Sequence, residues 1–315
     1  MKKILSLLLS VLLLLSLCAC GGESAEPTTE PTTEPAAEPT NEALPANVYY
    51  NTNWDGKSLK VLCIGNSFAR NATKVLYEIA QAHGVQEVAL GILYIGGCSV
   101  ETHWLNAQSG EAKYQYYKNT IGAWELMENV TFNYGLQDEQ WDVITITQGQ
   151  GLYGIPNSYD GCLEELIDYV NANKTNPDAQ IAFHMTWAFP KDSTIQRFQL
   201  YANNQDVMFK CIVDTARDRI LPTEGIDFLL PSGSAIQNAR TVMGDVFSAG
   251  DRFHLGALGE YVAGYSWFVY LTGQPIEELK YIDDSVGSSE TNRQAILDAV
   301  NASFRDPFTV TDVSK

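Results

Sequence analysis

Five apolar, β-prone runs separated by helix-compatible stretches limit the folds open to this chain. The runs cover residues 60–64, 88–95, 142–147, 180–187 and 227–230, and the helix-compatible stretches cover 73–83, 160–173, 204–220 and 255–271. Such alternation predicts parallel strands with helical crossovers on both faces of the sheet. We therefore expect an α/β protein, a three-layer α/β/α sandwich with a central, mainly parallel five-stranded sheet.

Polar or glycine-rich segments close each of these runs. Their representatives are Ser67, Gly97, Gln148, Trp187 and Pro231. Functional residues of open α/β sheets gather at the carboxyl ends of the strands. Parallel strands would bring these five segments to one rim, so the sequence predicts a single active site there.

Ser67 lies in the sequence Gly-Asn-Ser-Phe directly after the first run, and far downstream the sequence Asp-Arg-Phe-His supplies Asp251 and His254. A serine hydroxyl needs a base to take its proton and a third group to orient that base. Two side chains three residues apart in a tight turn can lie on one side. The spacing predicts Ser67, His254 and Asp251 as a catalytic triad; the alternative for Ser67 is a helix N-cap.

Three other histidines compete with His254 for the role of base. His83 ends a helix-compatible stretch and is expected to cap it. His184 lies in a predicted buried strand, where packing or local hydrogen bonding is expected. His103 follows the glycine loop and is a candidate for lining the substrate pocket. The spacing to Asp251 favours His254.

These blocks resemble the SGNH/GDSL hydrolase superfamily, whose nucleophile follows the first strand and whose Asp and His come from a C-terminal D-x-x-H block. They are closer still to a bacterial branch called domain of unknown function 4886. The blocks that carry this resemblance are residues 64–68, 94–99, 184–187 and 231–240, and it extends over roughly residues 57–275. It implies an SGNH/flavodoxin-like sheet and serine ester hydrolysis with no cofactor and no metal.

The resemblance also implies an oxyanion hole formed by the backbone N–H groups of Ser67 and Gly97 and by Gln148. The third block of the superfamily normally supplies an asparagine, whereas here the strand ends Thr-Gln-Gly-Gln at residues 147–150. This is similar to the Gln-Gly-Glu block of certain carbohydrate esterases, in which the glutamine amide is the donor. A second departure is Asn66 in place of the usual aspartate, which the closer branch shares.

Several side chains near these blocks are candidates for binding substrate. Aromatic faces stack on sugar rings, and three aromatic residues fall near the loops: Trp104, Tyr153 and Trp187. Packing in the core is the alternative for each. Asn238 and Arg240 would offer a polar wall, with a helix surface as the alternative.

The N-terminus is typical of an exported lipoprotein. Residues 1–19 combine Lys2 and Lys3 with an apolar stretch and end before Cys20 in a Leu-Cys-Ala-Cys sequence that resembles a lipobox. We expect a lipidated Cys20 to anchor the protein to the membrane; an ordinary secretory signal is the alternative. The repeated Glu-Pro steps of residues 20–47 predict a disordered spacer, leaving residues 48–315 as the catalytic domain.

Charge and cysteine spacing limit the classes of partner. A formal net charge of −18 argues against nucleic acid or anionic lipid as the main partner. The four domain cysteines lack C-x-x-C spacing, so we expect mostly buried free thiols and no metal site: Cys63, Cys98, Cys162 and Cys211.

The sequence therefore predicts an extracytoplasmic serine esterase that removes a small acyl group, acetyl in the first instance, from a carbohydrate. Its partners would be an acylated carbohydrate substrate and the membrane. A lipase- or thioesterase-type acyl hydrolase is the competing enzyme class. A lipoprotein that binds carbohydrate without catalysis is the competing non-enzyme class.

Overall fold

The computed structural model describes residues 49–315. The predicted signal peptide, the lipidation site Cys20 and the 20–47 spacer lie outside the described residues. None of the helices in the described part of the chain combines the length and apolar character needed to cross a bilayer.

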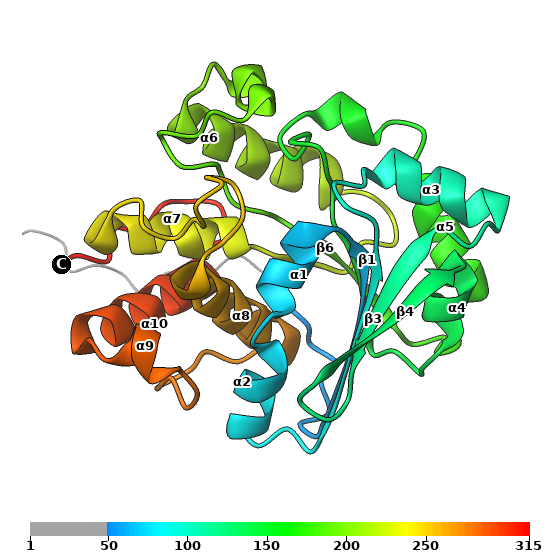
Figure 1. Ribbon diagram of the computed structural model, residues 1–315, viewed down its shortest axis with the longest axis horizontal. Coiled ribbons are helices and arrows are strands. Elements are labelled where there is room, and N and C mark those ends of the chain that lie inside the picture. Colours follow the sequence, from blue (N-terminus) through cyan, green and yellow to red (C-terminus); the bar gives the residue numbers. More distant parts are fainter. Residues whose placement is uncertain (1–48) are drawn as a thin grey trace, which may run out of the picture. The chain divides into compact units, whose positions relative to one another are not determined.

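A seven-stranded sheet with the order β4-β3-β2-β1-β5-β6-β7 forms the centre of the described domain (Figure 1). Its strands are β1 (Ser58–Gly65), β2 (Glu87–Tyr94), β3 (Tyr114–Asn119), β4 (Trp124–Val130), β5 (Val143–Ile146), β6 (Gln180–His184) and β7 (Phe228–Leu230). Strands β2, β1, β5, β6 and β7 are parallel. They correspond to the five predicted runs, so the predicted mainly parallel α/β fold is confirmed.

The β3–β4 hairpin adds two antiparallel strands beside β2 that the sequence pattern does not indicate. β4 is an edge strand, and its exposed positions include Glu125 and Glu128. Charged residues on an edge discourage pairing with another chain. They also remove the apolar signature that identifies the five parallel strands.

Helices cover both faces of the sheet. They are α1 (Ser67–Thr73), α2 (Leu76–Ala82), α3 (Val100–Ser109), α4 (Phe132–Gln137), α5 (Leu163–Asn173), α6 (Gln205–Thr215), α7 (Ser232–Met243), α8 (Ala257–Thr272), α9 (Asp284–Gly287) and α10 (Glu290–Arg305). Two 3₁₀ segments, η1 (Pro156–Tyr159) and η2 (Gln196–Tyr201), and one π-helical turn, η3 (Ala216–Ile220), complete the set. Helices α1, α2, α7, α8 and α10 lie on one side of the sheet, and α3, α4 and α5 lie on the other (Figure 1).

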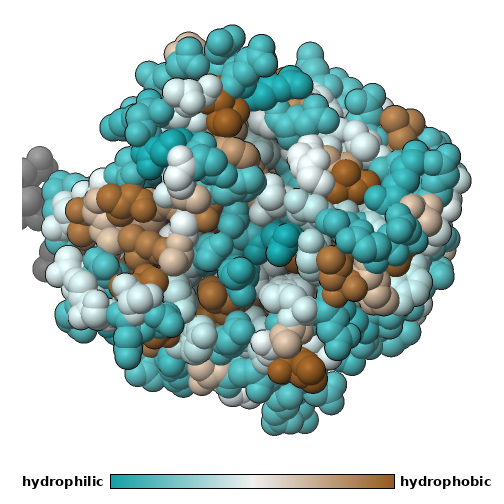
Figure 2. All heavy atoms as spheres, viewed as in Figure 1, coloured by the Kyte–Doolittle hydropathy of each residue, from teal (hydrophilic) through white to brown (hydrophobic). Residues whose placement is uncertain are grey.

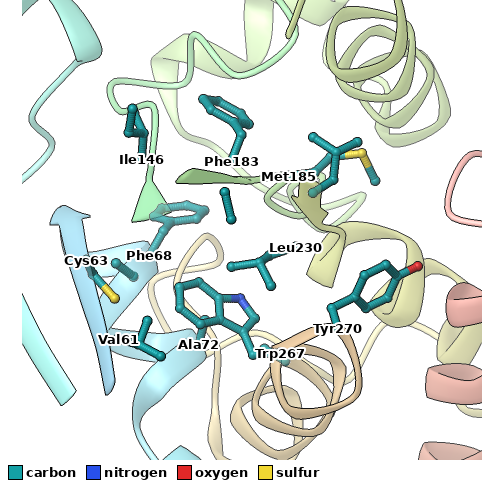
Figure 3. Packing of buried hydrophobic residues seen from close by; sticks show 14 of the residues in the cluster. Val61, Cys63, Phe68, Ala72, Ile146, Phe183, Met185, Leu230, Trp267 and Tyr270 are labelled. Carbon is teal, nitrogen blue, oxygen red and sulfur yellow. The ribbon is translucent and has the colours of Figure 1, made fainter. Parts of the chain in front are cut away.

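The core lies between the sheet and the helical layer formed by α1, α7 and α8. Figure 3 shows Val61 and Cys63 of β1 and Leu230 of β7 gathered around Phe68 of α1 and Trp267 of α8. All five side chains are buried. Burying a large apolar side chain contributes about 1.5–3 kcal/mol, so Phe68 is a strong anchor for the residue that precedes it, Ser67.

The four domain cysteines are free thiols, as predicted, and the pKa of each is raised by burial. Cys63 lies in β1, Cys98 precedes α3, Cys162 caps α5 and Cys211 lies in α6. A thiol with a raised pKa is a weak nucleophile. These side chains fill space and take no part in the site described below.

Candidate active site

The carboxyl ends of three adjacent strands are level with one another. Gly65 at the end of β1 pairs with Tyr94 at the end of β2, and Ile64 pairs with Ile146 at the end of β5. The segments that follow these strands therefore start from one edge of the sheet. Ser67 and Gly97, predicted to meet at this rim, both line one cavity there.

Ser67 is the first residue of α1, and Asn66 is the N-cap. The Asn66 side-chain oxygen accepts a hydrogen bond from the Phe68 N–H at 3.0 Å. The Phe68 ring stacks on Trp187 with 4.4 Å between the ring centroids. A short turn capped on one side and anchored in the core on the other fixes the direction of the Ser67 hydroxyl.

Asn66 stands where the superfamily usually has an aspartate, and the structure gives a reason for the asparagine. Its fully buried amide donates to the carbonyl oxygens of Cys98, at 3.1 Å, and Gln148, at 3.0 Å. A carboxylate has no hydrogen to donate to these acceptors. Asn66 thus joins the loops after β2 and β5 to the nucleophile turn.

The three predicted triad residues are brought together. His254 Nε2 lies 2.6 Å from Ser67 Oγ, and His254 Nδ1 lies 2.7 Å from Asp251 Oδ2. Both distances are within hydrogen-bonding range for a nucleophile–base and a base–orienter pair. The His254 side chain is 27% exposed, so part of the imidazole remains open to solvent and to substrate.

A single tight loop supplies both partners of Ser67. Asp251 Oδ1 accepts from the N–H groups of Phe253, at 3.2 Å, and His254, at 3.1 Å. The Ala249 N–H donates to the His254 carbonyl at 2.8 Å, and Arg252 adopts a positive φ of 60°. One carboxylate therefore shapes the loop with one oxygen and orients the imidazole with the other.

Hydrogen bonds from α1 and from the segment after β6 hold this loop in place. Asn71, one helical turn after Ser67, accepts from the Leu255 N–H at 3.2 Å and donates to Glu260 at 3.0 Å. Trp187 Nε1 donates to the Phe253 carbonyl at 2.9 Å. The Ser67–His254 separation is thus set by contacts on both sides of the histidine.

The ionisation states fit the triad. Burial raises the pKa of Asp251, but hydrogen bonds from His254 and Phe253 outweigh this and leave the pKa below its usual value. Burial lowers the pKa of both His103 and His184 to about 3. Near neutral pH, Asp251 is an anion beside His254, and the two buried histidines are uncharged.

His184 and His83 lie where the sequence predicted. The His184 ring nitrogens face Ser232 Oγ at 3.1 Å and Thr147 Oγ1 at 3.4 Å inside the core. His83 is the C-cap residue of α2. Neither is the partner of Ser67.

Two of the three predicted oxyanion donors, Ser67 and Gly97, lie at the cavity. Within residues 49–315, the backbone N–H groups of Ser67 and Gly97 have no acceptor, and both residues line the cavity beside the Ser67 hydroxyl. Gly97 has a positive φ of 64°, and no atom lies within 4 Å of where its Cβ would be. Unpaired backbone N–H groups beside the nucleophile are what a developing oxyanion requires.

The assignment of Gln148 as the third donor does not agree with the structure. Its side chain is fully buried and does not line the cavity: Oε1 accepts from the N–H groups of Val100 and Gly149, each at 2.9 Å, and Nε2 donates to Ser158 at 3.1 Å. Both ends of the amide are occupied within the protein. Gln148 therefore fixes the start of α3 and the loop after β5, and Gln150 is the residue of that loop that lines the cavity.

Replacing Gln148 with Ala is expected to lower stability, because two buried N–H groups lose their acceptor. Each such loss costs about 1–3 kcal/mol, so we expect the free energy of unfolding to fall by about 2–6 kcal/mol. Chemical denaturation measures this. Gln150→Ala, which changes an exposed glutamine two residues away, is the matched control and should stay within about 0.5 kcal/mol. Equal stability of both variants would contradict this role.

A cavity of about 340 Å³ opens beside Ser67. Its apolar wall is formed by Phe68, Tyr94, Tyr153, Phe189, Ile195 and Phe253. Polar groups come from Gln150 and Arg197. Hydrophobic side chains elsewhere on the face seen in Figure 2 form separate patches on a largely hydrophilic surface.

Three aromatic or histidine side chains predicted to bind substrate lie elsewhere. His103 is fully buried, with Nδ1 3.0 Å from the Tyr114 hydroxyl. Trp104 is half-buried in α3 and packs edge-on against Tyr169. Trp187 is fully buried beneath the His254 loop. Aromatic side chains next to a strand end pack into the layer of side chains beneath the rim, which is where these three lie. Of the aromatic candidates, Tyr153 is the one that lines the cavity.

Asn238 and Arg240, on α7, also serve the fold. The Asn238 side chain donates to the Ala299 carbonyl at 3.3 Å and accepts from the Thr311 N–H at 2.7 Å. Arg240 pairs with Asp245 at 2.9 Å and donates to the Ala188 carbonyl at 3.0 Å. A buried polar group must be hydrogen-bonded, and here the partners come from the protein rather than a substrate.

Asn71, Gln150 and Arg197 were missed by the sequence analysis. Asn71 lies four residues after Ser67, a helical spacing that could have indicated it once the nucleophile helix was assigned. Gln150 follows the strand-end block directly. Arg197 lies in a segment without strand or helix periodicity, and no sequence signal indicates it.

Within the described residues, no group of three or more His, Cys, Asp or Glu side chains is arranged to hold a metal ion. The nearest acid and imidazole to Ser67 are engaged with each other.

Comparisons with known proteins agree with the sequence blocks. The family profile described as "Domain of unknown function (DUF4886)" matches residues 60–301. The crystal structure of a DUF4886 family protein from Bacteroides uniformis ATCC 8492 is 33% identical, with a TM-score of 0.77, over 82% of this chain and 99% of that chain. A candidate SGNH hydrolase from Slackia heliotrinireducens is 16% identical, with a TM-score of 0.45, over 68% of this chain and 99% of that chain. No curated protein matches.

Proposed function

The chain belongs to the DUF4886 family, and we propose that it is a serine ester hydrolase that removes a small acyl group, acetyl in the first instance, from a carbohydrate. The observation that carries the proposal is the continuous hydrogen-bonded series from Ser67 Oγ through the His254 imidazole to Asp251. A nucleophile, a base and an orienting carboxylate in this order are the parts that acyl transfer needs.

The first half-reaction is acylation of Ser67. As Oγ attacks the carbonyl carbon of the ester, His254 Nε2 takes the hydroxyl proton, and Asp251 keeps Nδ1 protonated and stabilises the imidazolium. The carbonyl oxygen becomes an oxyanion that the Ser67 and Gly97 N–H groups can bind. Collapse of the tetrahedral intermediate expels the alcohol, which receives the proton from Nε2.

The second half-reaction is hydrolysis of the acyl-enzyme. Water attacks the acyl carbon while His254 Nε2 takes one of its protons, and the same N–H groups bind the oxyanion. Collapse releases the carboxylic acid and returns the proton to Ser67 Oγ. The partial exposure of the imidazole gives this water a route to Nε2.

The cavity composition supports a carbohydrate substrate. Tyr94 and Phe253 are half-buried rings beside Ser67, and Gln150 and Arg197 place hydrogen-bonding groups next to them. Ring faces that stack on the apolar side of a sugar, combined with polar groups for its hydroxyls, are typical of glycan sites. The lipobox resemblance supports an extracytoplasmic location with Cys20 anchored in the membrane.

Acetate release tests this function. The purified protein should release acetate from an aryl acetate and from at least one of a panel of acetylated plant, host and bacterial-wall polysaccharides. Release of longer fatty acids in preference to acetate would favour a lipase- or thioesterase-type enzyme. Binding of a deacetylated glycan without turnover of any ester would favour a carbohydrate-binding lipoprotein, and either result overturns the proposal.

A further inference from the structure

The charge of the candidate cavity differs from that of the protein as a whole. The chain has 38 Asp and Glu residues against 20 Lys and Arg. None of the described residues that line the cavity is Asp or Glu, and one, Arg197, carries a permanent positive charge. A cationic group in a cleft raises the local concentration of anions. The nearby anion Asp251 is hydrogen-bonded to His254 and does not line the cavity, so the lining itself is suited to a negatively charged group.

The Arg197 guanidinium lacks an acidic partner within residues 49–315. Four other arginines form ion pairs with Asp or Glu: Arg217, Arg219, Arg240 and Arg252. The polar contact of Arg197 is a long hydrogen bond of 3.4 Å to Gln150 Oε1. Because guanidinium carries five N–H donors, most of them remain available to a ligand.

The loop after β5 is shaped around Arg197. Gln150 and Gly151 both adopt positive φ, 57° and 72°, and a Cβ on Gly151 would lie 2.7 Å from Arg197 Cβ. The Tyr201 hydroxyl, at the end of η2, donates to the Gly151 carbonyl at 2.8 Å and accepts from the Gly154 N–H at 3.0 Å. These contacts fasten η2, and with it Arg197, to the edge of the cavity.

A second cation, Arg70, lies beside the lining residue Tyr94. The Arg70 guanidinium lies 4.2 Å from the Tyr117 ring centroid and 5.6 Å from that of Tyr94, which lines the cavity. Arg70 is exposed and has no acidic partner in the described part of the chain. Its charge adds to that of Arg197, so an anion near Tyr94 is attracted as well.

We propose that Arg197 is a specificity-determining residue that binds a substrate carboxylate, so that the substrate class is an O-acylated acidic carbohydrate containing hexuronic acid. This rests on the proposed esterase function. A planar guanidinium matches a carboxylate with two parallel N–H···O hydrogen bonds. A neutral sugar hydroxyl would leave the guanidinium without a counter-charge.

Matched sugars test this substrate class. Mono-O-acetylated methyl glucuronosides and galacturonosides would be compared with their C6 methyl esters, which differ by one negative charge. For the wild type, kcat/KM for acetate release should be about two- to fivefold higher for the better acid than for its methyl ester, as expected for an ion pair with the exposed Arg197 guanidinium. In Arg197→Gln this ratio should fall toward one, and in Arg197→Glu below one.

Lys57→Gln is the matched control, because it removes one positive charge immediately before β1, at the end of the sheet opposite Ser67. It should keep the wild-type ratio. A wild-type ratio near one, or a ratio that falls equally in Lys57→Gln and Arg197→Gln, would overturn the proposal. Such a result would leave the esterase function standing if acetate is still released from the methyl esters.

A binding measurement separates failure of this inference from failure of the esterase function. Calorimetry with methyl glucuronoside and methyl galacturonoside, which carry no acyl group, should show tighter binding of one or both than of the uncharged glycosides, and Arg197→Gln should abolish the difference. If this preference is found in a protein that cleaves no ester, the esterase proposal is wrong and the anion site stands. If wild type binds acid and neutral sugars equally, the anion site is wrong.

Discussion

Replacing Ser67 with Ala is expected to lower kcat for an aryl acetate by about 10⁴- to 10⁶-fold, because no other group at the rim can form the acyl-enzyme. The hydroxyl lies 2.6 Å from His254 Nε2, and the variant removes that oxygen without disturbing Asn66 or Phe68 on either side. Stopped-flow and steady-state release of the aryl alcohol measure the effect. The residual rate should show no burst.

Ser285→Ala, an exposed serine in the short helix α9, is the matched control for this loss. It should keep the wild-type kcat. Circular dichroism and thermal unfolding of both variants should overlay those of the wild type, since neither change opens a cavity in the core. A Ser67→Ala enzyme that turns over the ester within tenfold of the wild type would refute the triad assignment.

The part of the site that sequence reasoning predicted is the part encoded locally. Asp251 and His254 are three residues apart, so the spacing alone brings them together in a turn. Ser67 directly follows an apolar strand, and parallel strands share a rim, so its place in the fold follows from the strand pattern. The long-range Ser67–His254 contact then requires only that the loop before α8 reach the same rim, as it does.

The site predictions that were wrong depended on the direction in which a side chain points. At the irregular end of a strand, the pattern of apolar residues does not give this direction. Gln148 was assigned by similarity to another block, yet its side chain turns inward to two N–H groups, and Gln150 lines the cavity instead. Trp187 and His103 follow the same pattern: each is close to a functional loop in sequence and lies one layer beneath it in space.

The hairpin and the cavity edge were missed for a different reason. β3 and β4 carry polar and charged residues because they lie at the edge of the sheet, so their strand signal is weak. Arg197 reaches the rim through contacts of η2, including the Tyr201 hydroxyl, with Gly151, and such tertiary contacts leave no pattern in the sequence. The residues that set substrate preference are therefore harder to predict than those that perform the chemistry.

Replacing Asp251 with Asn is expected to lower kcat by about 10²- to 10⁴-fold. The carboxylate accepts from His254 Nδ1, which leaves Nε2 free to accept the Ser67 proton. An amide that presents its NH₂ to Nδ1 favours the other tautomer, whose Nε2–H cannot act as a base. The Asp251 side chain is 43% exposed, so water can partly take over its role as the acceptor for His254 Nδ1. We therefore expect the loss in kcat to be no larger than about 10⁴-fold. Asp251→Glu, which keeps the charge, should lose less.

The pH dependence identifies the base. An imidazolium cannot accept the Ser67 proton, so kcat/KM of the wild type should fall on the acid side, between about pH 5 and 8. Asp251, whose pKa lies below its usual value, stays ionised through that range, and His103 and His184, with pKa values of about 3, stay neutral. None of these three groups can therefore produce the acid limb. His184→Gln should keep the acid limb whatever its rate, whereas Asp251→Asn should lower kcat/KM at every pH, because the His254 imidazole loses the acceptor that orients it. Loss of the acid limb in His184→Gln, or wild-type kcat/KM in Asp251→Asn throughout the pH range, would mean that the base or its partner is wrongly assigned.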